Sequence, residues 1–185
     1  MSNTYLTILN ISRNSPADFR VKITSVEASS HTLSDTPDRI LDNNYETCYH
    51  SMEPEGGTPW VKVHFTTTAV TKVEIVNRLT CNLQLSVCVG RLEGVEVLLV
   101  SQGVTVRSCG RVTGVNLVSG LVHDQTYTVF CENEVGDAVV VRGRLEIPLN
   151  FNEIRLYTDP KEGQRANGRC AFRIYSKRVR TRDGR

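Results

Sequence analysis

Three features of the sequence predict an all-β fold, an antiparallel β-sandwich or jelly roll. Short stretches alternate apolar and polar residues, as strands with one buried face do. Gly, Asn, Asp or Pro separates most of these stretches at fairly even intervals, and no segment has a convincing helical period. Two antiparallel sheets that bury their inward faces account for this pattern.

The first expected strands lie in the N-terminal half of the chain. Residues 19–23 and 60–65 alternate apolar with basic side chains, and residues 70–76 set Val and Ile between Thr, Lys and Glu. In an extended chain, successive side chains point to opposite faces, so each stretch presents one apolar face. We expect each to be half-buried.

Four more strands are expected further along the chain. Residues 95–100 carry one glutamate among valines and leucines, and residues 138–142 are apolar up to a final arginine. Residues 126–130 alternate Thr with Tyr and Val, and residues 153–157 alternate charged residues with Ile and Leu. These spacings complete the predicted sandwich.

Length and composition are those of one folded domain with short extensions. The chain has 185 residues, of which 39% are hydrophobic and 23% charged, so it can bury a sizeable core. We expect an N-terminal extension at 1–24, the sandwich at 25–157 and a C-terminal extension with a basic tail at 158–185. No apolar run is long enough to span a bilayer. Residues 1–9 show no clear signal peptide, which fits a mature form, a fragment or another secretion route.

The C-terminal segment differs from the rest in charge. Residues 165–185 contain eight Lys or Arg and one acidic residue, a net +7, which leaves −5 for residues 1–164 of a chain with net charge +2. A basic tail can bind nucleic acid, heparin-like glycans or anionic lipid. A solvating tail is the commoner interpretation, and we expect no specific nucleic acid partner.

One histidine and two arginines are the candidate binding residues. They are His50 in Cys48-Tyr49-His50, Arg78 after Asn77, and Arg91 at the start of Arg91-Leu92-Glu93-Gly94-Val95-Glu96-Val97. An imidazole can hydrogen-bond a ring or hydroxyl oxygen of a sugar, and two guanidiniums present several N–H donors to neighbouring hydroxyls. Taken singly, each is more often a solvated surface group; the ordered set indicates a sugar site.

The order and the flanking residues resemble the F-type lectins, which are fucose-binding lectins with a discoidin-like β-sandwich. His50 stands two residues after a Cys as in their Cys-x-His, and residues 59–65 resemble their Pro-Trp-Trp-x-Val-Asp-Leu strand. The resemblance implies that His50, Arg78 and Arg91 bind the fucose ring oxygen and hydroxyls. Thr80 stands where the family has an Asp that orients the arginines, and residues 82–90 lengthen the stretch before Arg91.

The resemblance also implies a structural calcium ion. Side-chain or carbonyl oxygens would come from the residues that match the family's ligands, which are Arg39, Asp42, Asn44, Thr47, Asn152 and Glu153. Six or more oxygens suit this hard cation. The alternative is an Asp-Asn-Asn turn that Asx hydrogen bonds stabilise without metal.

Six cysteines without C-x-x-C spacing favour disulfides over zinc, and thus an oxidising, extracellular setting. By resemblance, Cys109 pairs with Cys131. Cys81 with Cys88 would staple the altered loop, while Cys48 and Cys170 are left over. In the family the residue matching Cys48 pairs with a Cys whose place Asn152 takes here.

We therefore expect a secreted, calcium-stabilised lectin for terminal fucose, a cell-recognition domain whose partners are fucosylated glycans or glycoproteins. It would act in several copies, as a homo-oligomer or within a multidomain protein. No enzyme motif is present, and we expect no catalysis. The alternative is a divergent module of the same fold that binds another glycan, a protein or an anionic membrane surface.

Overall fold

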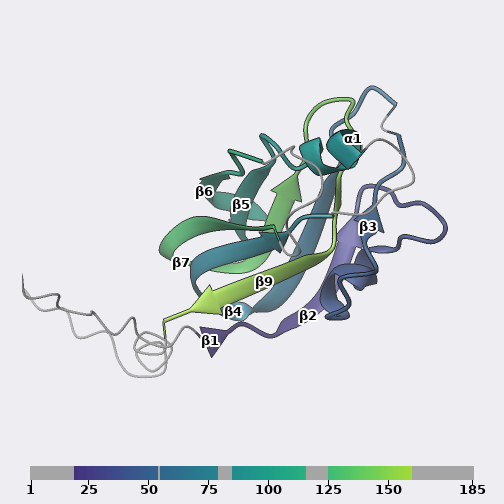
Figure 1. Cartoon of the computed structure of the whole chain (residues 1–185). Helices are drawn as coiled ribbons and strands as arrows, with labels where there is room; N and C mark the ends of the chain where they lie inside the picture. The colour runs from purple at the N-terminus through teal and green to yellow at the C-terminus, as the bar shows by residue number, and fades with distance from the viewer. Residues whose placement is uncertain (1–18, 54, 79–84, 116–124, 160–185) are drawn as a thin grey trace, which may run out of the picture.

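A computed structural model describes residues 19–53, 55–78, 85–115 and 125–159 of the chain. Seven strands form the main sheet, and adjacent strands in it are antiparallel. They are β1 (Phe19–Arg20), β2 (Ile23–Ala28), β4 (Trp60–Val76), β5 (Glu96–Ser101), β6 (Val104–Arg111), β7 (Thr126–Arg142) and β9 (Glu153–Thr158). A small second sheet pairs β3 (Tyr49–His50) with β8 (Asn150–Phe151). The predicted antiparallel all-β fold is confirmed (Figure 1).

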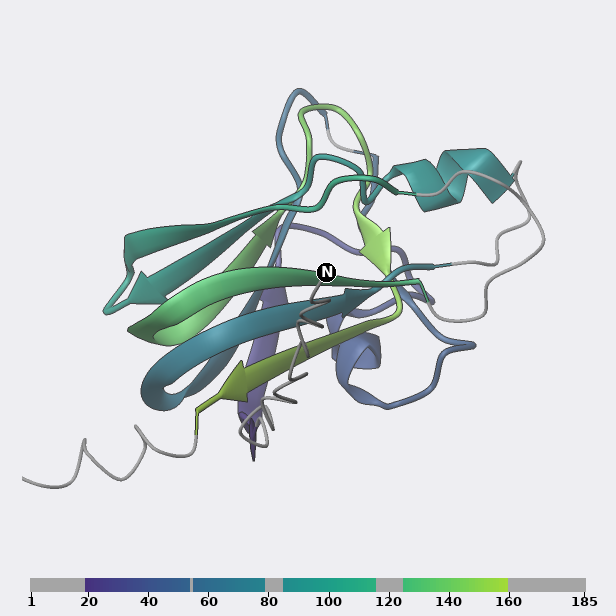
Figure 2. The same cartoon turned by 60° about the vertical axis from the view of Figure 1, so that its left-hand side comes forward.

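The two layers of the sandwich share their two longest strands. The N-terminal half of β4 pairs with β2 and with the C-terminal half of β7, next to β5 and β6. The C-terminal half of β4 pairs with the N-terminal half of β7 and with β9, which β1 joins. Figure 2 shows β4 and β7 each curving back at one end of the molecule.

A β-bulge in each of the two long strands, β4 and β7, allows it to bend. β4 places residues 65–67 opposite Asp137, and β7 places residues 131–133 opposite Thr71. Within the second bulge Glu132 and Asn133 adopt positive φ, at 55° and 62°. Extra residues on one strand of a pair bend it and increase its twist. Each long strand thus passes from one layer into the other.

Side chains from both layers meet in one core. The N-terminal half of β4 points Val61 and Val63 inward, and β9 points Ile154 and Leu156 inward from the other layer, all fully buried. Each such side chain contributes about 1.5–3 kcal/mol when removed from water. The alternation read from the sequence identified these inward positions.

The structure differs from the expected elements in several places. The stretches at 60–65 and 70–76 form one strand, as do those at 126–130 and 138–142, because a β-bulge and not a turn lies between them. The stretch at 19–23 divides between β1 and β2, and β6 was not foreseen. β1 and the start of β2 lie before residue 25, where we placed the start of the domain, and the domain limits stay a prediction.

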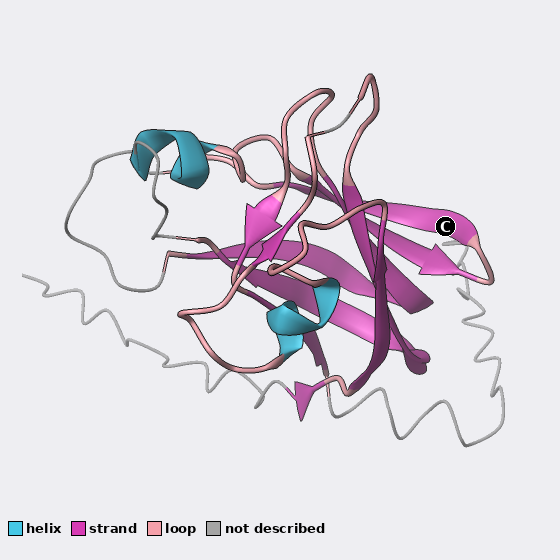
Figure 3. Cartoon of the chain, turned by 90° about the vertical axis from the view of Figure 1, so that its right-hand side faces the viewer, coloured by secondary structure: helices cyan, strands magenta, loops and turns pink. Residues whose placement is uncertain are grey.

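Two short helices were also not expected. They are the 3₁₀ helix η1 (Pro37–Leu41) and the α-helix α1 (Leu85–Gly90), both too short to show a period in the sequence. Figure 3 shows both among the loops at one end of the strands. In the described part of the chain, no helix has the length and apolarity to cross a bilayer.

Close packing near the bends predicts that Gly136 tolerates no side chain. A Cβ there would lie 2.7 Å from Leu99 Cδ1 and 2.7 Å from the Val100 carbonyl oxygen. Gly136→Ala should lower the free energy of unfolding by about 1–3 kcal/mol, because the core must shift to admit a methyl group.

Urea unfolding followed by tryptophan fluorescence measures this change. Gly57→Ala is the matched control, since a Cβ at Gly57 would meet nothing within 4 Å. We expect the control to change the free energy of unfolding by less than about 0.5 kcal/mol. Equal stability of the two variants would contradict the packing described for Gly136.

Candidate functional site

The ends of the strands gather the candidate residues at one end of the sandwich. Trp60, Arg142 and Glu96 lie side by side in one layer, and Val76 lies opposite Glu153 in the other. Because both long strands bend at their middle, these ends lie at the end of the molecule away from the bends (Figure 2). The segments that carry the predicted binding residues connect strands there.

His50 lies on β3, and its backbone is held on both sides. Its N–H donates to the Asp35 carbonyl at 3.2 Å, and its carbonyl accepts from the Thr32 N–H at 3.0 Å. The neighbouring Tyr49 is fully buried and makes an edge-on ring contact with Phe151, with 5.9 Å between ring centroids. These contacts fix the backbone of His50 at the rim of the core, and its side chain is 23% exposed.

Arg91 follows α1 and is almost fully buried, at 8% exposure. Its Nη1 lies 2.5 Å from His50 Nε2. With the Asn150 amide oriented to satisfy its partners, Asn150 accepts from the same Nη1 at 3.2 Å and donates to the Cys88 carbonyl at 3.2 Å. The lengthened stretch before Arg91 therefore still brings this guanidinium to His50.

Arg78 follows the end of β4 and reaches the same place. Its Nη1 lies 3.9 Å from the Asp35 carboxylate, which lies 3.9 Å from His50 Nδ1. The structure thus brings together His50, Arg78 and Arg91 from three distant segments. Thr80, which stands where the F-type lectins have an Asp, lies outside the described residues.

Asp35 and Asn150 belong to the site, and the sequence reasoning missed both. Asp35 forms ion pairs with Arg39 and Arg78, and its carboxylate also lies near His50 Nδ1. It precedes a Thr-Pro pair that starts η1, and no motif spacing connects it with His50. Asn150 faces His50 across the β3–β8 pair, a contact that only the tertiary structure creates.

The charges around His50 favour a neutral ring. Burial lowers the pKa of His50, the Arg91 and Arg78 cations lower it further, and Asp35 and Glu53 act in the opposite direction. A guanidinium only donates, so His50 Nε2 is the acceptor and the ring proton sits on Nδ1, toward Asp35. Burial also lowers the pKa of Arg91, but not enough to remove its charge near neutral pH.

The predicted calcium residues also come together, beside η1. Asp42 Oδ1 accepts from the Asn44 N–H at 2.8 Å, and Asp42 Oδ2 accepts from the Thr47 hydroxyl at 2.7 Å. Arg39 lies within η1, and the Asn152 side-chain amide donates to the Tyr45 carbonyl. The hydrogen bonds to the Asp42 carboxylate are those expected of the metal-free Asx turn, and they also hold the turn in shape.

Glu153 is the feature that this turn alone does not explain. Its side chain is fully buried, and neither carboxylate oxygen has a hydrogen-bond partner. Burial raises its pKa to about 7 and the Asp42 charge adds to this, although the nearby Asn43 backbone and two arginines oppose the shift. Asn152 Oδ1 is likewise buried without a partner. A cation between these oxygens would satisfy them.

Carboxylates alone would not complete such a site. Among the residues that the structure describes, no group of three or more His, Cys, Asp or Glu is placed to bind a metal. Asp42 and Glu153 would need amide, hydroxyl and carbonyl oxygens beside them, which Asn44, Thr47 and Asn152 carry. This donor set fits calcium, which prefers oxygen, and does not fit zinc.

The cysteines follow the expected pattern where they are described. Cys109 and Cys131 form a disulfide that ties β6 to the bulge of β7. Cys88 is also disulfide-bonded, and its predicted partner Cys81 lies outside the described residues, as does Cys170. Cys48 is a free, buried thiol.

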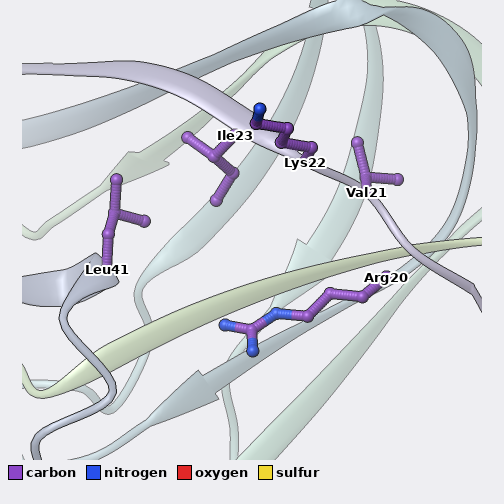
Figure 4. A pocket seen from close by; sticks show the side chains of 5 residues that line it. All are labelled: Arg20, Val21, Lys22, Ile23 and Leu41. Carbon is purple, nitrogen blue, oxygen red and sulfur yellow. The ribbon is translucent and has the colours of Figure 1, made fainter.

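Two surface hollows lie apart from this cluster. One, of about 320 Å³, is lined by Arg20, Val21, Lys22, Ile23 and Leu41 beside η1 (Figure 4). The other, of about 330 Å³, lies on the outer face of β4, β5 and β7 around Trp60. Neither includes His50, Arg78 or Arg91.

Comparisons with known proteins relate the fold to sugar-binding domains. No family model and no curated protein sequence matches the chain. A fucose-binding module of Streptococcus pneumoniae has a similar structure, with a TM-score of 0.55, 20% identity, and coverage of 72% of this chain and 89% of that one. The lectin domain of lectinolysin, solved with Lewis B antigen, gives a TM-score of 0.57 and 20% identity over 71% and 90% of the two chains.

An F-lectin (fucolectin) from the serum of Morone saxatilis, the striped bass, is similar in the same way. Its TM-score is 0.56 at 23% identity, over 72% of this chain and 46% of that chain. At such identities the similarity shows the fold. The expected resemblance to the F-type lectin fold is therefore confirmed, within the wider group of sugar-binding β-sandwiches.

Cys48 should be unreactive in the folded protein. Burial raises the pKa of its thiol to about 11, and it lies within the core. At pH 8 only roughly 1 in 1,000 such thiols is ionised, against about one in four for a free cysteine.

We expect iodoacetamide to modify Cys48 at least roughly 100-fold more slowly in native protein than in urea. Peptide mapping by mass spectrometry separates Cys48 from the other cysteines. Equal rates in the two conditions would contradict the buried free thiol.

Proposed function

We propose that this chain, which has the fold of the F-type lectins, is a non-catalytic carbohydrate-binding domain that recognises terminal fucose. The convergence of His50, Arg78 and Arg91 supports the proposal, because segments far apart in sequence bring them to one place. The solved structures with similar folds include fucose-binding and lectin modules, which supports the same class of ligand.

The three side chains offer the polar groups that a small sugar needs. Each guanidinium carries five N–H donors, of which Arg91 uses one on His50 and one on Asn150. Their further donors can bind hydroxyl oxygens, and hydrogen bonds from charged donors are the stronger kind. A sugar that displaces Arg91 from His50 Nε2 would also gain the imidazole as an acceptor. Binding of this kind makes and breaks no covalent bond.

Calcium has a structural role in this proposal. Asp42, Asn44, Thr47, Asn152 and Glu153 would hold it, with the Arg39 carbonyl, at the turn between η1 and β3. When bound, the ion supplies positive charge that satisfies the Glu153 carboxylate. The same turn leads through Cys48 and Tyr49 to His50, so a fixed turn favours a fixed imidazole.

The cellular setting follows from the same proposal. Disulfides at Cys109–Cys131 and at Cys88 suit an oxidising compartment, and we propose a secreted protein whose partners are fucosylated glycans or glycoproteins. Single sugar sites are weak, so recognition of a cell surface would use several copies, through oligomers or tandem domains.

Titration calorimetry with L-fucose tests the function directly. The oxidised, calcium-loaded protein should give saturable binding at one site for each chain, and galactose should give none. No heat from fucose, with a folded sample, would mean that this fold serves another ligand.

Arg78→Ala should weaken fucose binding while leaving the domain folded, because Arg78 is half-buried at the rim and outside the core. Losing charged hydrogen bonds worth about 1.5–3 kcal/mol reduces affinity roughly 10- to 150-fold. Arg107→Ala is the matched control, since Arg107 pairs with Glu132 near the strand bends. Equal affinity in Arg78→Ala and parent would remove Arg78 from the site.

Chelation should destabilise the domain, and more so at higher pH. The folded pKa of Glu153 is about 7, above its ordinary 4.5, so the metal-free domain loses stability as pH rises through that interval. Calcium offsets this loss by stabilising the charged carboxylate. At a concentration 100 times its Kd, calcium adds about 3 kcal/mol, which is roughly 5–10 °C in Tm.

Melting curves with and without EDTA, at pH 5 and pH 8, measure the effect. We expect a larger difference at pH 8, where Glu153 would otherwise be charged without a partner. In Glu153→Gln both the pH dependence of the metal-free protein and the response to EDTA should diminish. An identical Tm with and without EDTA at pH 8 would exclude a stabilising calcium site.

A further inference from the structure

We infer that Asp35 is the positioning residue of the candidate site, the carboxylate that orients His50 and Arg78 for the sugar. This inference rests on the proposed function for its role in binding. Its structural basis is independent of that function, because Asp35 makes these contacts with other residues of the chain.

One carboxylate connects three basic side chains. Asp35 Oδ1 lies 3.6 Å from Arg39 Nη1, while Oδ2 lies 3.9 Å from His50 Nδ1 and 3.9 Å from Arg78 Nη1. Each oxygen thus has its own partners. Arg39 holds the carboxylate from the side of η1, and the other oxygen faces the candidate sugar ligands.

The backbone fixes Asp35 in this position. Its N–H donates to the Thr32 carbonyl at 3.3 Å, and its carbonyl accepts from the His50 N–H at 3.2 Å. Thr36 is extended, with φ −71° and ψ 156°, and Pro37 then begins η1. These contacts tie residues 32–37 to β3 and place the Asp35 side chain beside the imidazole.

The site needs such an anion because its two guanidiniums, those of Arg78 and Arg91, repel each other. Arg78, Arg91 and His50 gather donors and positive charge in a half-buried space, where opposite charges within about 4–6 Å have large effects. Asp35 is itself only 18% exposed, so water screens it poorly. Glu53 also acts on His50 and Arg91, but it is exposed.

The consequence for His50 concerns its tautomer. A proton on Nδ1 is attracted to Asp35, which leaves Nε2 as the acceptor that Arg91 contacts. Without the carboxylate, the Arg91 donor alone favours the Nδ1–H tautomer, so the preference weakens, and Arg78 loses a partner that holds its guanidinium. The first change would turn the Nε2 acceptor of His50 into a donor, and the second would leave the Arg78 donors less well oriented toward the sugar.

Asp35→Asn tests the inference, because it keeps the shape of the side chain and removes its charge. In the sugar-free protein, ¹⁵N NMR of His50 should show the Nδ1–H tautomer in the parent. The variant should show a mixture of tautomers and titrate at lower pH, since an anion that favours the protonated ring is lost. Calorimetry should show fucose affinity reduced at least roughly 10-fold.

Two further variants separate positioning from general stability. Asp35→Glu restores the charge and should recover part of the affinity and of the His50 signals. Asp38→Asn removes one carboxylate from the same region, within η1, and should leave His50 and fucose affinity unchanged. An Asp35→Asn variant with the fucose affinity and the His50 signals of the parent would overturn the inference.

The NMR measurement also keeps the two proposals distinguishable. If the parent binds no fucose but its His50 depends on Asp35, the proposed function fails and the positioning role stands. If Asp35→Asn does not fold, the parent alone decides: a His50 proton on Nε2 would overturn the role of Asp35.

Discussion

The rest of the structure depends on the pairing of β4 with β7. Two strands of 17 residues each remain paired across both layers, which is possible only because each carries a bulge that turns it. The bend places the loops of both layers at one end. Residues from β3, from the end of β4, and from the segment after α1 can therefore meet, although the sequence separates them widely.

At this end the fold manages buried charge in two ways. In the His50 cluster, the Asp35 carboxylate and the cations Arg39 and Arg78 compensate one another within the protein. Beside it, the carboxylate oxygens of Glu153 have no hydrogen-bond partner, and burial raises the pKa of Glu153 to about 7. Burying a charge without a partner is costly, and the proposed calcium ion would remove that cost. The two centres are joined through η1 and the turn that follows it.

The chain departs from the pattern it resembles at several points, and the structure shows how some of these departures are accommodated. Asn152 replaces a cysteine, and its amide donates to the Tyr45 carbonyl while Cys48 stays a buried free thiol. A hydrogen bond thus connects these segments where the resemblance implies a disulfide. The longer stretch before Arg91 contains α1, and Arg91 still reaches His50.

By itself, the sequence determined the all-β class and the inward faces of most strands, and it predicted that His50, Arg78 and Arg91 act as a group. Alternation with period two is a local property of an extended chain, and so it can be read along the sequence. It did not determine that paired stretches such as 60–65 and 70–76 are one bent strand, since a bulge leaves the alternation on both sides intact. Asp35, Asn150 and the isolation of Glu153 belong to the tertiary structure alone. Their roles depend on distances and burial between segments far apart in the chain, for which the sequence carries no periodic signal.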